Sequence, residues 1–256
     1  MSLSVMTCNL RVWTESDGSN AWPYRRDELA QLIWKRKPLV LGTQEGLATM
    51  LADLDQRLPE YSRVGKGREG GSAGEHNVLY YHESLGQPLE HSQFWLSDTP
   101  DQPGSMAWDS SLPRICTWAV FYVPWTRSTV AVFNCHLDHR GAQARSQAAR
   151  VIWQRMQPCF TTGIPCILMG DFNCEPGSEP HRYLRQYLVD GLESVRMSHI
   201  GTFHGFTGES SGGPIDWILA SRGTNFSVVE VLRQKQNGRY PSDHFPVWAQ
   251  LEVPVD

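Results

Sequence analysis

The chain has 256 residues, 40% of them hydrophobic, which is enough for one large domain with a substantial core. Its formal net charge of −4 at pH 7 excludes the basic field that drives non-specific binding to long nucleic acids. No linker, low-complexity tract or internal repeat interrupts the sequence, so we predict a single domain over residues 1–256.

The cysteines and the start of the sequence bear on the cellular compartment. Six cysteines are scattered along the chain without a C-x-x-C pair, so we expect reduced, mostly buried thiols and no cysteine-rich metal site. The sequence runs directly into LSVMTCNL, without the basic and apolar regions of a secretion signal. No apolar run approaches membrane-spanning length. These features predict a cytoplasmic protein without membrane insertion and with no evident obligate protein partner.

Short apolar runs and helical stripes alternate in the first half of the chain. Five apolar residues between 47 and 58 have the spacing of one helix face and directly follow an apolar run. Pro38 ends the preceding helical segment. The predicted elements are, in order, a strand at 3–9, a helix at 24–37, a strand at 39–42, a helix at 47–58 and strands at 77–81 and 92–95.

The second half of the chain contains more strands than helices. A break at 124–127 separates two β-rich segments and predicts a hairpin. Long loops are expected at 63–74, 98–113 and 201–214. The predicted elements are strands at 114–123 and 128–136, a helix at 142–156, a strand at 164–169, a short helix at 179–188, and strands at 215–220, 226–232 and 247–253. This mixture of hairpins and strand–helix–strand units predicts an α/β fold with two packed, mostly mixed sheets and helices outside.

One stretch, IPCILMGDFN at 164–173, combines a buried-strand signal with polar residues. The apolar run ends at Gly170, and Asp171 and Asn173 follow just past the carboxyl end of the predicted strand. In layered α/β proteins ligands bind at that end of the strands. Taken alone, the segment fits an ordinary Asp/Asn turn equally well.

The same arrangement recurs on other predicted strands. Carboxylates, carboxamides and histidines without cysteine suit a hard divalent cation such as Mg²⁺, bound through oxygen. Zinc would prefer denser His or Cys ligation, and no H-E-x-x-H motif occurs. The polar residues at or just beyond predicted strand ends are Asn9, Glu45, His136, Asp138, Asp171, Asn173, Asp216, Asp243 and His244. So many at comparable positions predict a common site rather than unrelated caps and turns.

These segments resemble those of the endonuclease/exonuclease/phosphatase superfamily of metal-dependent phosphoesterases. The matching motifs are MTCNL, GTQEG, NCHLDH, MGDFN, PIDWIL and YPSDHFPVWAQL, which occur in the family's order and cover essentially the whole chain. The resemblance implies a four-layer α/β sandwich, with two packed mixed β-sheets flanked by helices and the site between the sheets. It also implies hydrolysis of a phosphodiester or phosphomonoester with Mg²⁺, or Mn²⁺ in its place.

The resemblance assigns a metal site and a group that activates water. Glu45 corresponds to the main metal carboxylate, and Asn9 and Asp243 complete or support the ion site. Asp171 corresponds to the residue that orients and deprotonates the attacking water. Asn173 corresponds to the residue that holds the water or the phosphate.

Two histidines correspond to phosphate-binding residues of the family. His244 contacts the scissile phosphate in this assignment, and Asp216 fixes its ring. His136 is a second phosphate-binding histidine, with Glu75 as its carboxylate partner. The chemistry agrees, because phosphoester hydrolysis needs positive charge on the equatorial oxygens. A His–carboxylate pair supplies that charge near neutral pH by raising the imidazole pKa.

Further contacts are expected from the loops. Arg114 is the strongest additional candidate for a phosphate ligand, with a surface salt bridge as the alternative. Asp138, His204 and Trp108 are further candidate substrate contacts. Within the family, His136 stands where the abasic-site endonucleases have Asn, which argues against that activity here. The longer insertions and basic motifs of the inositol phosphatases are not found either.

Three functions remain open from the sequence. The first is Mg²⁺-dependent hydrolysis of a phosphorylated small molecule, and the second is a nuclease for short or single-stranded nucleic acid. The third is a non-catalytic family member that binds a phosphorylated ligand or a protein. The absence of an Arg/Lys cluster interleaved with aromatics counts against a long-duplex binder. The full acid–base set counts against the non-catalytic reading.

Overall fold

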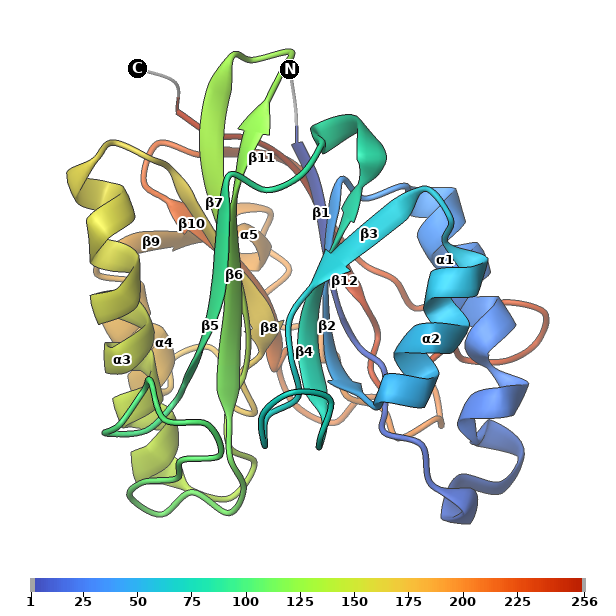
Figure 1. Ribbon diagram of the computed structural model, residues 1–256. Helices are drawn as coiled ribbons and strands as arrows, with labels where there is room; N and C mark the ends of the chain where they lie inside the picture. The colour runs from blue at the N-terminus through green and yellow to red at the C-terminus, as the bar shows by residue number, and fades with distance from the viewer. Residues whose placement is uncertain (1–2, 255–256) are drawn as a thin grey trace.

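Two β-sheets face each other at the centre of the molecule, and helices cover their outer faces (Figure 1). The computed structural model describes residues 3–254. Each sheet has six strands and mixes parallel with antiparallel neighbours. The predicted four-layer α/β sandwich is therefore confirmed.

The first sheet carries helices α1 (Arg26–Arg36) and α2 (Ala48–Arg57) on its outer face. Its strand order is β11-β12-β1-β2-β4-β3, and only β1 and β2 run parallel. The apolar stripes of both helices pack against β1, β2 and β4 in one buried cluster. The strands are β1 (Leu3–Asn9), β2 (Val40–Gly46), β3 (Tyr61–Val64), β4 (His76–His82), β11 (Asn225–Val231) and β12 (Val247–Glu252).

The second sheet is covered by helix α3 (Ala142–Thr161), with α4 (Glu179–Leu184) beside it. Its strand order is β5-β6-β7-β8-β10-β9, and only β7 and β8 run parallel. No helix among residues 3–254 is both long and apolar enough to cross a membrane. The strands are β5 (Glu90–Trp95), β6 (Ile115–Val123), β7 (Ser128–His136), β8 (Cys166–Asp171), β9 (Leu188–Asp190) and β10 (Asp216–Ser221). The remaining short elements are η1 (Glu15–Asn20), η2 (Trp22–Tyr24), η3 (Glu83–Leu85) and α5 (Gly191–Ser194).

The inner faces of the sheets form an apolar core that becomes polar toward the site. Asn134 on β7 is fully buried and donates to the backbone carbonyls of Thr43 and Val78 across the interface, both at 2.9 Å. Its side-chain oxygen accepts from Gln44 Nε2 at 2.7 Å. Since buried amides are costly unless their hydrogen bonds are made, this network fixes how the two sheets meet.

Several predicted boundaries differ from the observed ones. β2 continues to Gly46 rather than ending near residue 42, because Thr43 and Gln44 are polar but fully buried. The edge strand β3 begins before the loop predicted from residue 63 and extends into it. β9 is only three residues long and gives no periodic signal. Helix α3 continues past Pro158 to Thr161; Pro158 removes one N–H donor, yet its carbonyl still accepts from Thr162 N at 3.1 Å.

Reducing agent is expected to leave the thermal stability unchanged. All six cysteines are free thiols, five of them buried and Cys174 half-buried. Comparing melting temperatures by calorimetry with and without excess reductant tests this expectation. A fall of several degrees in reductant would mean that at least one structural disulfide forms in solution.

Candidate active site

Three residues predicted for the site stand in one row across the second sheet. His136 ends β7 and pairs with Asp171 at the end of β8. Asp171 in turn pairs with Asp216, the first residue of β10. The ladder therefore places one histidine and two carboxylates side by side, although they are far apart in sequence.

The backbone at Asp171 is shaped for this close approach. Gly170 has φ +151°, and a Cβ there would lie 2.0 Å from the carbonyl oxygen of Cys135 on β7, so only glycine fits. Beyond the strand, Asn173 adopts φ +49°, its N–H donates to Asp171 Oδ1 at 2.9 Å, and its Nδ2 donates to Leu137 O at 3.0 Å. The DFN segment is thus a turn that also fixes the Asp171 carboxylate.

The first sheet contributes Asn9 from the end of β1 and Glu45 from β2. The pairing of β2 with β4 is irregular between Thr43 and Gly46, and Glu45 has φ +62° within that irregularity. A positive φ is uncommon for glutamate, which marks a locally constrained backbone. The Glu45 carboxylate is held by Val12 N–H, which donates to Oε2 at 2.7 Å.

The two sheets meet at the amide of Asn9. Its Nδ2 donates to Glu45 Oε1 at 2.9 Å and to Asp171 Oδ2 at 3.0 Å. Asn9 is fully buried, and its Oδ1 accepts from Arg11 N at 2.8 Å, which fixes the orientation of the amide. One carboxylate from each sheet is therefore held at the same point.

His244 and Asp216 form a buried pair beside Asp171. His244 Nδ1 lies 2.9 Å from Asp216 Oδ2, and His244 Nε2 lies 3.9 Å from Asp171 Oδ2. Burial disfavours the imidazolium, but the surrounding carboxylates, Asp216 above all, outweigh it and raise the pKa of His244 to about 10. His244 is therefore a cation at neutral pH in this environment.

The pKa values of Asp171 and His136 are shifted in the directions that favour the neutral form of each side chain. Burial, reinforced by the charge of Asp216, raises the pKa of Asp171 to about 7. His136 is also buried, and desolvation together with Arg114 holds its pKa well below the ordinary value. His136 Nε2 lies 3.4 Å from Asp171 Oδ2. A carboxylate that titrates near neutral pH is suited to accepting a proton.

The site opens into a cavity of about 390 Å³. Most of the predicted site residues line it, namely Glu45, Glu75, Arg114, His136, Asp171, Asn173, Asp243 and His244. Asn9 and Asp216 support this lining from behind through the hydrogen bonds described above.

Arg114 lies on the cavity wall and is buried, which argues against a surface salt bridge. Its Nη2 lies 2.9 Å from His139 Nδ1, and its Nε lies 3.5 Å from Asp138 Oδ2. Burial lowers the pKa of Arg114, and Asp138 opposes that effect. The guanidinium is thus held rigidly with its charge facing the cavity.

Three predicted substrate contacts are absent from the cavity lining. Asp138 is buried and accepts from the N–H groups of Ser111, Arg140 and Gly141, so it organises the loops that carry Arg114. His204 stacks on Phe245 with ring centroids 3.9 Å apart, and Trp108 lies in the exposed loop. Among the described residues, Asp138 and His204 have structural contacts instead, and none of the three lines the cavity.

The expected pairing of Glu75 with His136 does not appear among the described contacts. Glu75 lines the cavity, but its Oε2 lies 2.9 Å from Arg68 Nη1. Burial raises the pKa of Glu75, and Arg68 opposes that shift. The carboxylate nearest to His136 Nε2 is instead Asp171, supplied by the neighbouring strand.

Several lining residues were not identified from the sequence. Arg11 lies two residues after Asn9, and its Nε is 3.7 Å from Asp243 Oδ2; His139 directly follows Asp138. Phe203 is half exposed, and its ring lies 5.1 Å from that of His244. Proximity to predicted residues could have indicated Arg11 and His139. Phe203 lies in a loop whose position depends on its bridge to His244.

The donor set fits a hard divalent cation. Glu45, His136 and Asp171 each offer one ligand atom, and these atoms lie within 4.8 Å of one another. Burial raises the pKa of Asp171 and of Asp243, so the surrounding protein does not fully compensate these carboxylates. Uncompensated oxygen ligands at one point are the preferred environment of Mg²⁺ or Mn²⁺.

Comparisons with known proteins support the fold described above. A model of the Endonuclease/Exonuclease/phosphatase family matches residues 8–244. A mannosyl-6-phosphatase of Bacteroides thetaiotaomicron VPI-5482 is 32% identical, with a TM-score of 0.89 over 98% of this chain and 100% of that one. A family protein of Bacteroides vulgatus is 30% identical, with a TM-score of 0.92 over 99% and 100% of the two chains. Another from B. thetaiotaomicron is 32% identical, with a TM-score of 0.91 over 98% and 95%. No curated protein matches the sequence.

Proposed function

Because the chain belongs to the Endonuclease/Exonuclease/phosphatase family, we propose that it is a Mg²⁺-dependent phosphoesterase that hydrolyses a small phosphate ester by in-line attack of water. Family members hydrolyse phosphate esters, and the site has the groups for that reaction. The observation that carries the proposal is the meeting of Glu45, Asn9 and Asp171 beside the buried His244–Asp216 pair.

Glu45 would hold the metal, with Asp243 and Asn9 completing or supporting its environment. When bound, Mg²⁺ supplies Lewis-acid stabilisation of charge on the phosphoryl oxygens. The residues around it have separate tasks. Asn9 and the Val12 N–H hold the Glu45 carboxylate in place, which fixes the orientation of its free lone pairs.

Asp171 is the proposed general base. Its Oδ1 accepts from Asn173 N–H and its Oδ2 accepts from Asn9, so the carboxylate cannot rotate freely. A pKa near 7 lets it be ionised at neutral pH and still take a proton from water as the water attacks phosphorus. Asn173 beside it would hold the water or a phosphoryl oxygen.

Cationic groups would bind the phosphate. His244 carries positive charge that Asp216 stabilises, and Arg114 presents a second fixed cation at the cavity wall. Both would donate to equatorial phosphoryl oxygens, where negative charge develops in the transition state. His136 is held neutral by burial and Arg114, so it would contribute a hydrogen bond rather than charge.

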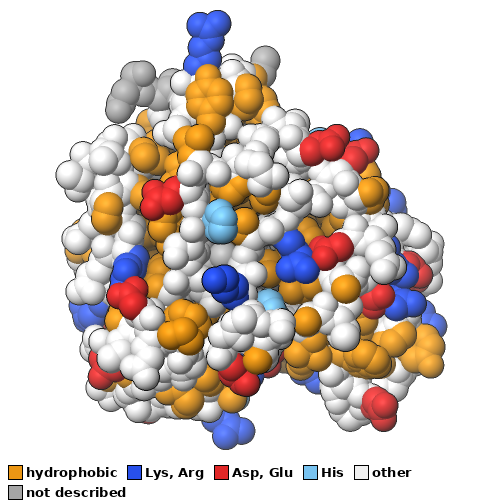
Figure 2. Space-filling view, viewed as in Figure 1, with side chains coloured by type: hydrophobic (Ala, Val, Ile, Leu, Met, Phe, Trp, Pro, Cys, Tyr) orange, Lys and Arg blue, Asp and Glu red, His pale blue; other side chains and the backbone are white. Residues whose placement is uncertain are grey.

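The size of the site favours a small substrate. A cavity of about 390 Å³ accommodates a phosphate with one sugar-sized group. Figure 2 shows Lys and Arg scattered among Asp and Glu on the viewed face, without a continuous basic band that would track a nucleic-acid backbone. The 32% identical mannosyl-6-phosphatase supports a sugar phosphate monoester as the first substrate to test.

A hydrolysis panel tests the proposal. Purified protein with Mg²⁺ or Mn²⁺ is assayed against sugar phosphates, phosphodiesters, phosphoinositides and short oligonucleotides. We expect turnover of a small ester and little turnover of long duplex DNA. Preferred cleavage of single-stranded oligonucleotides would favour a nuclease instead. Tight phosphate binding with no turnover of any compound would favour a non-catalytic binding protein.

Replacing Asp216 with Asn is expected to move the pH–rate profile to lower pH. Loss of the neighbouring anion lowers the pKa of His244 from about 10, so the alkaline limb should shift by about one to three pH units. The acidic limb should also move to lower pH, because the charge of Asp216 raises the pKa of Asp171 in the wild type. Measuring kcat/KM from pH 5 to 11 checks both limbs. An alkaline limb that stays in place or moves upward contradicts the role of His244.

A further inference from the structure

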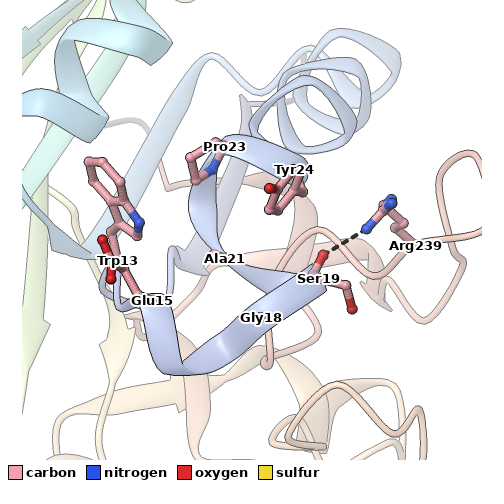
Figure 3. A pocket seen from close by; sticks show the side chains of 8 residues that line it. All are labelled: Trp13, Glu15, Gly18, Ser19, Ala21, Pro23, Tyr24 and Arg239. Atoms are coloured by element: carbon pink, nitrogen blue, oxygen red, sulfur yellow. Dashed lines mark hydrogen bonds between the residues drawn. The ribbon is translucent and has the colours of Figure 1, made fainter.

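A second cavity lies next to the candidate active site and is larger, at about 620 Å³. Its wall is formed by the segment that leaves β1 and winds through η1 and η2, and it is closed on one side by Arg239 (Figure 3). Trp13 and Tyr24 stand on opposite sides of this cavity, with Pro23 between them. None of these residues has a task in the proposed hydrolysis.

The aromatic rings of this cavity are unusually exposed for the protein. The side chains of Trp13 and Tyr24 are 40% and 59% exposed, whereas most aromatic residues of the chain are packed in the core. Exposed aromatic rings that face a concave space are typical of ligand-binding sites, since they offer apolar area at little cost in side-chain entropy. Glu15 and Arg239 add one carboxylate and one guanidinium to the same wall.

The wall is held rigidly before any ligand binds. Arg11 forms two hydrogen bonds to the Asp17 carboxylate, at 2.9 and 3.0 Å, and Arg239 Nη1 donates to Ser19 O at 2.7 Å. Behind the wall, the buried Arg25 donates to the backbone carbonyls of Leu10, Arg11, Asn20 and Pro241. A loop fixed by this many hydrogen bonds loses little conformational entropy on binding.

The linings of the two cavities meet at consecutive residues. Arg11 and Val12 line the candidate active site, and Trp13, the next residue, lines the second cavity. Consecutive Cα atoms lie about 3.8 Å apart, so the two cavities border the same short stretch of backbone. A ligand that occupies both cavities would place its phosphate beside Asp171 and its next group toward Trp13.

We propose that this cavity binds an uncharged sugar residue of a phosphorylated oligosaccharide or glycoside, a substrate class that rests on the proposed phosphoesterase function. The apolar face of a pyranose ring would stack on the Trp13 indole. Glu15 and Arg239 would hydrogen-bond its hydroxyl groups, as a carboxylate acceptor and a guanidinium donor. A nucleic-acid strand fits less well. Among the described residues that line the cavity, Arg239 is the only Lys or Arg, and Glu15 would face the phosphates.

Kinetics with matched substrates test the proposal. The substrates are mannose 6-phosphate and α-mannobiose phosphorylated at the same position of its non-reducing sugar. We expect the wild type to prefer the disaccharide. Trp13→Ala should lower the ratio of the two kcat/KM values about tenfold, the scale of losing one apolar pocket contact. Trp13→Phe, which keeps a ring, should restore part of the preference. An unchanged ratio in both Trp13→Ala and Tyr24→Ala overturns the proposal.

Tyr122→Ala is the matched control. Tyr122 is an aromatic residue 42% exposed on β6, where it pairs with Thr129 near the far end of the β6–β7 hairpin. Thr129 lies seven positions before His136 along β7, which is about 23 Å at the usual rise per residue. The ratio should not change in this variant. If Trp13→Ala fails to give a cooperative melting transition, Tyr24→Ala provides the test alone, because Tyr24 comes from η2 and is more exposed.

A binding measurement separates this proposal from the proposed function. The indole N–H resonance of Trp13, assigned by its loss in Trp13→Phe, is followed by NMR during titration with unphosphorylated α-mannotriose. We expect a saturable shift even if neither phosphate ester is hydrolysed, in which case only the proposed function fails. A shift with the oligonucleotide dT4 and none with mannotriose overturns the carbohydrate assignment.

Discussion

Asp171→Asn is expected to lower kcat by at least about 100-fold, the usual range for losing a general base. Asparagine keeps the size and shape of the side chain but cannot take a proton from water. The amide also fits the site poorly as an acceptor, because Asp171 receives hydrogen bonds from Asn9 and Asn173. KM should change little. The measurement is steady-state kinetics on the best substrate from the panel, and near-wild-type kcat would mean that Asp171 only forms a turn.

The same variant should stay folded. The pKa of Asp171 is raised by burial to about 7 in the folded protein, above its value of 3.8 in a model compound. The folded state therefore binds this proton more tightly, and the contribution of Asp171 to stability falls as pH rises from about 4 to about 7. Asp171→Asn removes that loss, which offsets the one hydrogen bond that the amide nitrogen cannot accept. At pH 8 its melting temperature in metal-free buffer should be no lower than that of the wild type.

Asp190→Asn is the matched control for this change. Asp190 is also a buried aspartate facing a histidine, with its Oδ2 2.9 Å from His181 Nε2, but it lies at the end of β9 on the edge of the second sheet. Its Oδ1 caps α5 by accepting from Leu192 N at 2.7 Å. Asp190→Asn should therefore lower the melting temperature and leave kcat within about twofold of wild type. Asp171→Asn should show the reverse, a large loss of kcat with no loss of stability. This difference would show that Asp171 acts in the reaction and is not needed merely as a buried carboxylate.

Removal of divalent metal is expected to abolish turnover completely, and Mg²⁺ or Mn²⁺ should restore it. Glu45 and Asp171 are held within reach of one amide, and burial raises the pKa values of Asp171 and Asp243, so a bound cation would stabilise these carboxylates. The assay is turnover in excess chelator followed by titration with either ion. Full activity in excess chelator would rule out the metal site.

Metal binding also has a readout independent of catalysis. A cation that binds only the folded state raises the melting temperature in proportion to the logarithm of its concentration. Mg²⁺ should therefore stabilise the wild type, and Glu45→Gln should weaken that stabilisation by removing the main metal carboxylate. If Mg²⁺ shifts both proteins equally, Glu45 does not hold the ion.

The sequence by itself determined the layers and most of the elements. Long apolar runs and helical stripes are local signals, so β1, β6 and β7 and the start of α3 lie at or within one residue of their predicted positions. The short edge strands β3 and β9 were missed, since three or four residues carry little periodicity and take their structure from a neighbouring strand.

The sequence also identified a group of polar residues that the fold brings together, because such residues recur at the ends of several predicted strands. Asn9, Glu45, Asp171, Asp216 and His244 all lie at the point where the two sheets meet. Their order along the chain and the chemistry of their side chains were enough to predict a common oxygen-rich site. This prediction could be made without knowing the distance between any two of these residues.

Only the tertiary structure decided which side chains pair. Asn9 and Asp171 are 162 positions apart, and their hydrogen bond depends on how two sheets pack. Glu75 forms an ion pair with Arg68 and not with His136, and Asp138 accepts hydrogen bonds from backbone N–H groups. Each carboxylate therefore binds the donors that the folded loops place next to it. Sequence patterns indicate which faces of the strands and helices are buried. The hydrogen-bond partner of each side chain depends instead on distances that are set only when the two sheets pack together.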